Sequence, residues 1–214
     1  MYVCFVKQST LFNEVEMDDK TAIDELVFIR KVIEETKKAV VYNGKDYIFW
    51  GVLVIVGMMS TYIFHLSGLY FNYFWIWVVL IPIGWIFSIY NRIKLKEKHP
   101  PTYSGKLIRA VWAAAGIAMT IVGFVGPMMG TIKPMAISPI ACIIMGSAYF
   151  VSGKIVDVKW LGNLSFGWWI GGIVLLFVTS IHSFLIMALL MLFFQTLPGI
   201  IIYRKYKQTM TAKS

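Results

Sequence analysis

Six long apolar runs, separated by short polar segments, dominate the chain after residue 46. They lie at about 47–66, 72–91, 107–126, 135–152, 160–179 and 182–203, and we number them as spans one to six. A helix of about 20 apolar residues can cross the roughly 30 Å hydrocarbon core of a bilayer. The pattern predicts an all-α polytopic membrane protein with six transmembrane helices arranged as three hairpins. It divides the chain into an N-terminal segment (1–46), a transmembrane bundle (47–203) and a basic tail (204–214).

The composition excludes an ordinary soluble domain. Hydrophobic residues make up 58% of the chain and charged residues 14%, whereas soluble domains average roughly 45–50% and 25%. Nine of the eleven acidic residues precede residue 47, and only Glu97 and Asp157 follow it. The cysteines, Cys4 and Cys142, lie in a polar and an apolar region. We therefore expect neither a structural disulfide nor a cysteine metal site.

Basic residues indicate the orientation. Nineteen of the twenty lysine and arginine residues lie before span one, between spans two and three or at the start of span three, between spans four and five, or after span six. Lys133 is the exception, in the loop between spans three and four. By the positive-inside rule both termini are cytoplasmic, in a multi-pass protein of the bacterial inner membrane. The net charge of +9 then reflects topology and anionic lipid in the bilayer, and we expect no nucleic-acid binding.

Aromatic residues agree with this orientation, because amphipathic rings favour the headgroup level. Several of them cluster near the outer ends of spans one and two. Others are interpreted as marking the inner edges of the spans, namely Tyr47, Trp50, Tyr90, Trp112, Trp160 and Tyr203.

Small residues recur within the spans and predict close helix contacts inside the bundle. A homodimer interface is the alternative for these stripes. They comprise Ala110, Ala114 and Ala118 in span three, Cys142, Gly146 and Gly153 in span four, and Gly167 and Gly171 in span five.

No Asp, Glu, Lys or Arg lies near the centre of a span, which weakens an ion-coupled transport reading. Four polar residues in or at the ends of the spans are expected to make interhelical hydrogen bonds rather than substrate contacts. They are Thr120, Ser147, Asn163 and Gln195.

Candidate metal ligands gather towards the outer ends of the spans. They are His65, His182, Met128, Met129 and Met135. Imidazole and thioether groups suit copper, but methionine also fills irregular gaps without any metal, and none of the spacings is diagnostic. We expect no metal and no cofactor. The sequence contains no nucleophile elbow, phosphate-binding glycine loop, HExxH motif or paired carboxylates, and so no residue indicates catalysis.

A cytoplasmic amphipathic helix is expected at about residues 20–42. Its apolar residues recur at alternating steps of four and three, which is the spacing of one helix face. We expect Leu26, Ile29, Ile33 and Val40 to contact a partner. Acidic and basic residues balance on the polar side, which favours protein contact over a lipid surface. The face could pack under its own bundle, pair with a second copy, or bind a soluble protein.

The N-terminal helix resembles that of a loose group of uncharacterised bacterial six-span membrane proteins, often encoded beside winged-helix regulators. The shared pattern is acidic-Leu-x-x-Ile-Arg followed by a glycine before span one, matched by Glu25, Leu26, Ile29, Arg30 and Gly44. The rest of the chain is similar only in hydropathy. The resemblance implies the same architecture and brings no activity or catalytic residue.

Two functional hypotheses follow. The first is a non-enzymatic sensory, regulatory or scaffold component of the membrane that acts through its cytoplasmic helix. The second is a small transporter or the substrate-binding component of one. A polar-lined central cavity would favour the second, whereas a solid core around Ala114, Gly146 and Gly171 would count against it. Residues 1–16 have no consistent pattern, so Met17 is a candidate for the natural start.

Overall fold

The computed structural model describes residues 23–24, 27, 44–68, 74–98 and 103–211. The expected helix at 20–42, with its contact residues Leu26, Ile29, Ile33 and Val40, lies largely outside the described residues. What can be described is the membrane part of the chain. It confirms an all-α protein with six long apolar helices suited to cross a bilayer.

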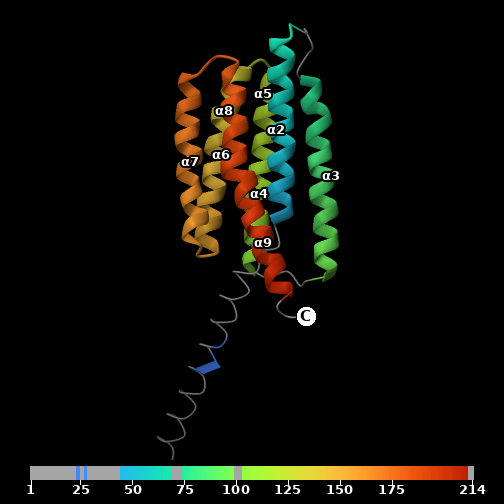
Figure 1. Cartoon of the computed structure of the whole chain (residues 1–214), viewed down its shortest axis with the longest axis vertical. Helices are drawn as coiled ribbons and strands as arrows, with labels where there is room; N and C mark the ends of the chain where they lie inside the picture. Colours follow the sequence, from blue (N-terminus) through green and yellow to red (C-terminus); the bar gives the residue numbers. More distant parts are fainter. Residues whose placement is uncertain (1–22, 25–26, 28–43, 69–73, 99–102, 212–214) are drawn as a thin grey trace, which may run out of the picture.

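The six spans run antiparallel, side by side (Figure 1). Span one is α2 (Gly44–Leu66), span two is α3 (Phe74–Lys98), span four is α6 (Pro134–Ile155) and span five is α7 (Lys159–Phe177). Two spans are composite. Span three joins α4 (Tyr103–Thr120), the π-helical segment η1 (Ile121–Val125) and α5 (Gly126–Met128), and span six joins α8 (His182–Met191), the π-helical segment η2 (Leu192–Thr196) and α9 (Leu197–Thr211).

The two spans of each predicted hairpin are in contact, and further contacts tie the hairpins together. The helix α2 packs against all three parts of span six, and α6 packs most closely against α7. At the α6–α7 crossing, a Cβ atom on Gly153 would lie 2.5 Å from the Cα of Gly162. Glycine therefore lets these two backbones approach closely, as small residues do between membrane helices. The helix α3 lies at the edge of the bundle beside α2 (Figure 1).

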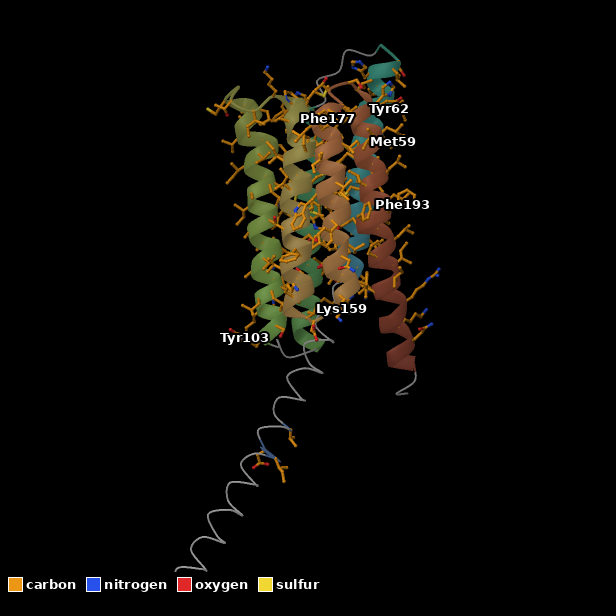
Figure 2. All side chains as sticks on the ribbon, turned by 90° about the vertical axis from the view of Figure 1, so that its left-hand side faces the viewer. Met59, Tyr62, Tyr103, Lys159, Phe177 and Phe193 are labelled. Atoms are coloured by element: carbon orange, nitrogen blue, oxygen red, sulfur yellow. The ribbon has the colours of Figure 1, made fainter. Side chains whose placement is uncertain are left out.

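One end of the bundle is basic. It contains the starts of α2, α4 and α7 and the ends of α3, α6 and α9 (Figure 1). The lysine and arginine residues with described side chains lie there, except Lys133 between α5 and α6; they are Lys45, Arg92, Lys94, Lys106, Arg109, Lys154, Lys159, Arg204 and Lys207. Tyr103 and Lys159 lie at this basic end, and Tyr62 lies near the opposite end (Figure 2).

Both π-helical segments stand just before a proline. Pro127 and Pro198 each follow the last residue of η1 or η2 by two positions. A proline in a helix has no N–H to donate and its ring clashes with the carbonyl four residues earlier. Widening the turn is one way to relieve this conflict, and such bulges are frequent at functional sites. In η2 the hydroxyl of Thr196 donates a 3.1 Å hydrogen bond to the carbonyl of Met191, five residues earlier.

The turn between α6 and α7 is short and capped by its own backbone. Asp157 has a positive φ of 51°, which is the left-handed conformation that commonly ends a helix. The N–H of Val158 then donates a 3.1 Å hydrogen bond back to the carbonyl of Gly153. Asp157 therefore ends α6 through its backbone conformation.

The prediction of contacts within the bundle is confirmed for spans four and five. In span three it is wrong for Ala110 and Ala114, to which the homodimer alternative still applies, while Ala118 is half-buried. Gly167 would place a Cβ against Phe194, and Gly171 would place one 2.6 Å from Leu190, both on span six. Ala110 and Ala114 are exposed on the outside of the bundle. The inward face of α4 instead carries the larger Ile108 together with Ala115, both buried.

Candidate functional site

Tyr149 is the centre of a buried cluster to which five of the six spans contribute. It is 0% exposed, and its hydroxyl donates a 2.5 Å hydrogen bond to the Oε1 of Gln195 in η2. The interhelical hydrogen bond expected of Gln195 is thus confirmed. A polar pair of this kind inside a membrane bundle fixes two helices relative to each other, because no water competes for the bond.

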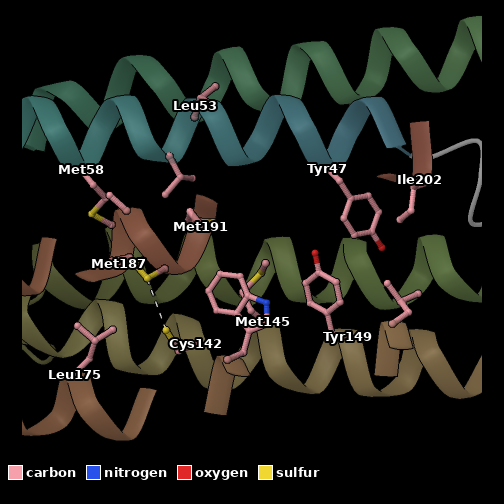
Figure 3. Packing of buried hydrophobic residues seen from close by; sticks show 14 of the residues in the cluster. Tyr47, Leu53, Met58, Cys142, Met145, Tyr149, Leu175, Met187, Met191 and Ile202 are labelled. Carbon is pink, nitrogen blue, oxygen red and sulfur yellow. Dashed lines mark hydrogen bonds between the residues drawn. The ribbon is translucent and has the colours of Figure 1, made fainter. Parts of the chain in front are cut away.

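Aromatic rings surround Tyr149. Tyr47 of α2 and Trp112 of α4 meet it edge-on, at ring centroid distances of 5.8 and 5.3 Å. Trp168 of α7 stacks on it at 6.3 Å and 22°, and Tyr47 also meets Trp112 edge-on at 5.1 Å. Each such pair adds about 0.5–1.5 kcal/mol beyond its area burial. Figure 3 shows Tyr47 and Tyr149 between α2 and α6, near Ile202.

The interpretation of Tyr47 as an inner-edge marker is wrong in one respect. Its side chain is only 5% exposed and packs inside the bundle, whereas a ring anchored at the headgroups would face lipid and water. The sequence indicated how far along the span Tyr47 lies, but not whether its side chain points into or out of the bundle. That direction depends on which helices lie beside α2.

Three buried polar atoms of this cluster have no hydrogen-bond partner within the described part of the chain. They are the Nε1 atoms of Trp112 and Trp168 and the Oγ of Ser152, which is one helical turn from Tyr149. The Tyr47 hydroxyl is a neighbour to which Trp112 could donate after a small shift. For Trp168 and Ser152 no such neighbour is shown.

The core around this cluster is filled by side chains. A Cβ on Gly146 would collide with the indole of Trp169, and one on Gly171 would collide with Leu190. Further along the bundle, the thiol of Cys142 donates to the Sδ of Met187 at 3.7 Å (Figure 3). At Gly171 the space towards span six is thus occupied, whereas Trp169 is only partly buried and lies against the exposed Phe150 and Phe166. Ala114 was expected to belong to a solid core together with Gly146 and Gly171, but it is exposed instead.

Two of the other polar residues do not bridge helices as expected. Thr120 donates a 2.8 Å hydrogen bond to the carbonyl of Gly116, and Ser147 donates a 3.0 Å bond to that of Ile143, each within its own helix. Short hydroxyl side chains reach the preceding turn of their own helix more easily than they reach a neighbour. Asn163 is exposed on α7.

A second set of contacts joins α2, α3 and α9 at the basic end. A Cβ on Gly44 would lie 2.9 Å from the backbone nitrogen of Tyr203, and Gly199 is equally close to α2. The Nζ of Lys45 lies 5.7 Å from the centroid of the Tyr203 ring. The first turn of α2 is therefore packed against α9 backbone to backbone.

The same turn is bonded to α3. The Nδ2 of Asn91 donates a 2.8 Å hydrogen bond to the Oδ1 of Asp46. One turn deeper in the bundle, the indole of Trp50 donates a 2.8 Å bond to the Oγ of Ser88. The start of α2 is thus the point where spans one, two and six meet.

The metal candidates are only partly brought together. The hydroxyl of Tyr62 and the Nδ1 of His182 lie 3.3 Å apart, and the neighbouring Ser183 donates to the Sδ of Met135 at 3.7 Å. His65, Met128 and Met129 are exposed near the same end of the bundle. Among the described residues, no group of three His, Cys, Asp or Glu side chains could hold a metal ion. A copper site there stays an untested hypothesis.

Searches for a matching protein-family model, a curated relative or a similar solved structure found no match for this chain. The membrane-protein assignment therefore depends on the chain itself. Its six helices have the length and hydropathy of membrane spans.

Proposed function

We propose that this chain is a non-enzymatic sensory, regulatory or scaffold component of the bacterial inner membrane, acting through its N-terminal cytoplasmic segment. The observation that carries the proposal is the packing of Gly44 against α9. The N-terminal segment enters the membrane at this residue, where α2 contacts Tyr203 and Gly199 at backbone distance. A displacement of the start of α2 would therefore be passed to span six.

The bonds from α2 to α3 support the same proposal. Asp46 and Trp50 connect the first two turns of α2 to Asn91 and Ser88. Since α3 lies at the edge of the bundle beside α2, the start of α2 is well placed to move it. Coupling of this kind needs an element that both sites can bias, and we propose α2 for this role because of its contacts with α3 and α9.

The distribution of cations supports the orientation in this proposal. The basic end described above contains the entry of span one and the exit of span six. By the positive-inside rule that end faces the cytoplasm, where the N-terminal segment could meet a soluble partner.

The second candidate, a small transporter or substrate-binding component, has one observation in its favour. The cluster around Tyr149 draws side chains from five spans, which is a usual position for a ligand site in a helix bundle. Against transport, Leu190 of span six fills the space beside Gly171. Signalling is therefore the better supported proposal.

The test combines a deletion with a matched pair of point variants. Deleting residues 17–42 should abolish capture of protein partners in mild detergent or change the oligomeric state. Gly199→Ala should weaken the same interaction, because its Cβ would lie 2.8 Å from the Cβ of Tyr47. Gly123→Ala is the control, since nothing lies within 4 Å of its added Cβ. If the deletion leaves both partners and oligomeric state unchanged, the proposal is wrong.

A further inference from the structure

The outward faces of α6 and α7 are apolar along most of their length, and each carries a lysine at the basic end. On α7 the exposed side chains recur at alternating steps of four and three, which keeps them on one face of the helix. They are Lys159, Asn163, Phe166, Ile170, Ile173 and Phe177. Lys159 and Phe177 mark the two ends of this face (Figure 2). On α6 the same spacing relates the exposed residues Ile143, Ser147, Phe150 and Lys154.

Trp169 joins these two faces into one surface. Its ring lies 5.8 Å from that of Phe150 on α6 and 5.8 Å from that of Phe166 on α7, centroid to centroid. Gly146 leaves room for the indole, because a Cβ at this position would collide with it. Phe150 and Phe166 are 38% and 55% exposed. Three neighbouring rings therefore cover the seam between α6 and α7 on the outside of the bundle.

The two lysines border this aromatic surface at the basic end. The Nζ of Lys154 lies 5.6 Å from the centroid of the Phe150 ring, a distance at which a cation is attracted to the face of a ring. This contact holds the ammonium group against the outward face of α6. Lys159 begins α7 shortly after α6 ends at Ile155, so the short turn keeps both lysines at one level of the bundle.

Asn163 adds an exposed amide to the same border. It lies on the same face of α7 as Lys159, and residues four apart on a helix are neighbours. A rise of 1.5 Å per residue places it about 6 Å deeper than Lys159. That depth is within the headgroup layer, which is roughly 5–7 Å thick on each side of the hydrocarbon core. An amide there can donate to a phosphate or to an ester carbonyl.

We propose that this surface, which we call the α6–α7 face, binds an anionic phospholipid in the leaflet at the basic end. The phosphate lies between the ammonium groups of Lys154 and Lys159, with Asn163 bonded to the headgroup. The acyl chains run over the rings of Phe150, Trp169 and Phe166 towards the centre of the bilayer.

The order of residues along both helices matches a phospholipid better than a protein. A phospholipid needs cations at one end of its site and apolar surface over the rest, and basic groups beside membrane spans attract anionic headgroups. The hydroxyl of Ser147 is bonded within its own helix, so it adds little polarity to the apolar part. The inference does not depend on the proposed function, because it uses no contact of the N-terminal segment.

Asp157 supplies a test with the opposite sign. It lies in the turn between the two lysines and is exposed, so its carboxylate repels an anionic headgroup. Removing this charge should therefore strengthen binding. Asparagine also tolerates the positive φ of 51° at this position, so Asp157→Asn changes the charge and keeps the turn.

Native mass spectrometry of the full chain, released from detergent micelles with added lipid, tests the proposal. Phosphatidylglycerol and phosphatidylcholine with identical acyl chains are titrated in parallel, and glycerol phosphate tests for recognition of phosphate alone. Phosphatidylglycerol should bind more tightly than phosphatidylcholine. Lys154→Gln combined with Lys159→Gln should lower its affinity about 25-fold, from about fivefold for each lysine beside an anionic headgroup. Asp157→Asn should raise it.

Two matched controls separate the α6–α7 face from the rest of the surface. Lys94→Gln combined with Lys106→Gln removes the same charge from the basic end and should change the affinity little. Lys94 is a close match because it also lies over an exposed ring, 5.9 Å from the centroid of Tyr90. Phe166→Ala should weaken binding of both lipids, whereas Phe193→Ala should not, although the two phenylalanines are equally exposed at 55%.

Equal affinity for the two lipids would overturn the proposal. An equal loss in the control pair of lysines would do so too, as would binding of glycerol phosphate as tight as that of phosphatidylglycerol. A second copy of the chain bound in place of lipid, or unchanged lipid binding after Phe166→Ala, would also contradict it.

Discussion

The hydroxyl of Tyr149 and the Oε1 of Gln195 form a 2.5 Å hydrogen bond between α6 and the π-helical segment of span six. Both side chains are buried, at 0% and 4% exposure, so neither can turn to water instead. The bond lies where the helical turn is widest and where the core contacts of α2, α4 and α7 converge.

Tyr149→Phe should therefore destabilise the protein by about 1–3 kcal/mol, because the Gln195 carbonyl is left buried without its donor. The ring contacts with Trp112 and Trp168 are retained by phenylalanine. The free energy of unfolding in mixed micelles measures the effect.

Two further variants test that explanation. Tyr103→Phe is the matched control, since Tyr103 is 73% exposed, and it should change stability little. Adding Gln195→Met to Tyr149→Phe should recover part of the loss, because an unpaired partner costs more than an apolar pair. An equal loss in both tyrosine variants would contradict the role of the bond.

The α6–α7 crossing offers a comparison between two glycines that face each other. Gly153→Ala should destabilise the protein by about 1–3 kcal/mol through overpacking, because its Cβ would lie 2.5 Å from the Gly162 backbone. Gly162→Ala should be tolerated, since its Cβ would lie 3.8 Å from the Gly153 Cα. Melting temperatures of the two variants in one detergent test this. Equal losses in the two variants would contradict this difference between the glycines, and no loss in either would mean that the two helices move apart at little cost.

The spans could be predicted from the sequence because crossing a bilayer requires long apolar helices whatever their neighbours. Gly146, Gly153, Gly167 and Gly171 could also be assigned to contacts, since glycine in a membrane helix usually marks close approach. The prediction that the alanines of span three make contacts inside the bundle failed because an apolar residue can face lipid as easily as protein. In a membrane protein, hydrophobicity does not separate the inside from the outside.

The cluster around Tyr149 could not be predicted for a related reason. Its members lie far apart in the sequence, and their meeting depends on α6 packing between α4 and α7. The only available signal was that a glutamine interrupts the apolar run of span six near Pro198. Polar residues inside a span usually find a partner, but sequence alone does not indicate which of the remaining spans supplies it.

Thiol labelling in intact cells tests the proposed orientation. Cysteine at Met129 should react with a membrane-impermeant reagent from outside, because this residue is 69% exposed at the end opposite the basic one. Cysteine at Lys159 should react only after the membrane is made permeable. Cys4 is first replaced by serine, while Cys142 is buried. The reverse pattern would place the basic end outside the cell and overturn the orientation.

The contacts of α3 lead to the last prediction. This helix lies at the edge of the bundle and is joined to α2 by the bonds from Asn91 to Asp46 and from Trp50 to Ser88. Ser88→Ala combined with Asn91→Ala removes both bonds and few apolar contacts. We expect α3 to open locally more often than the rest of the bundle, because local opening is governed by the contacts that each element makes.

Hydrogen exchange with mass spectrometry can measure this opening helix by helix. Amides of α3 should exchange faster in the double variant, while those of α6 and α7 should keep their rates, because the Gly153–Gly162 crossing is untouched. Ser147→Ala is the control for removal of a hydroxyl from a span. Faster exchange in all six spans would mean that α3 is an integral part of the core. Unchanged exchange would mean that the apolar seam, in which Gly57 packs against Trp77, holds α3 without the polar bonds.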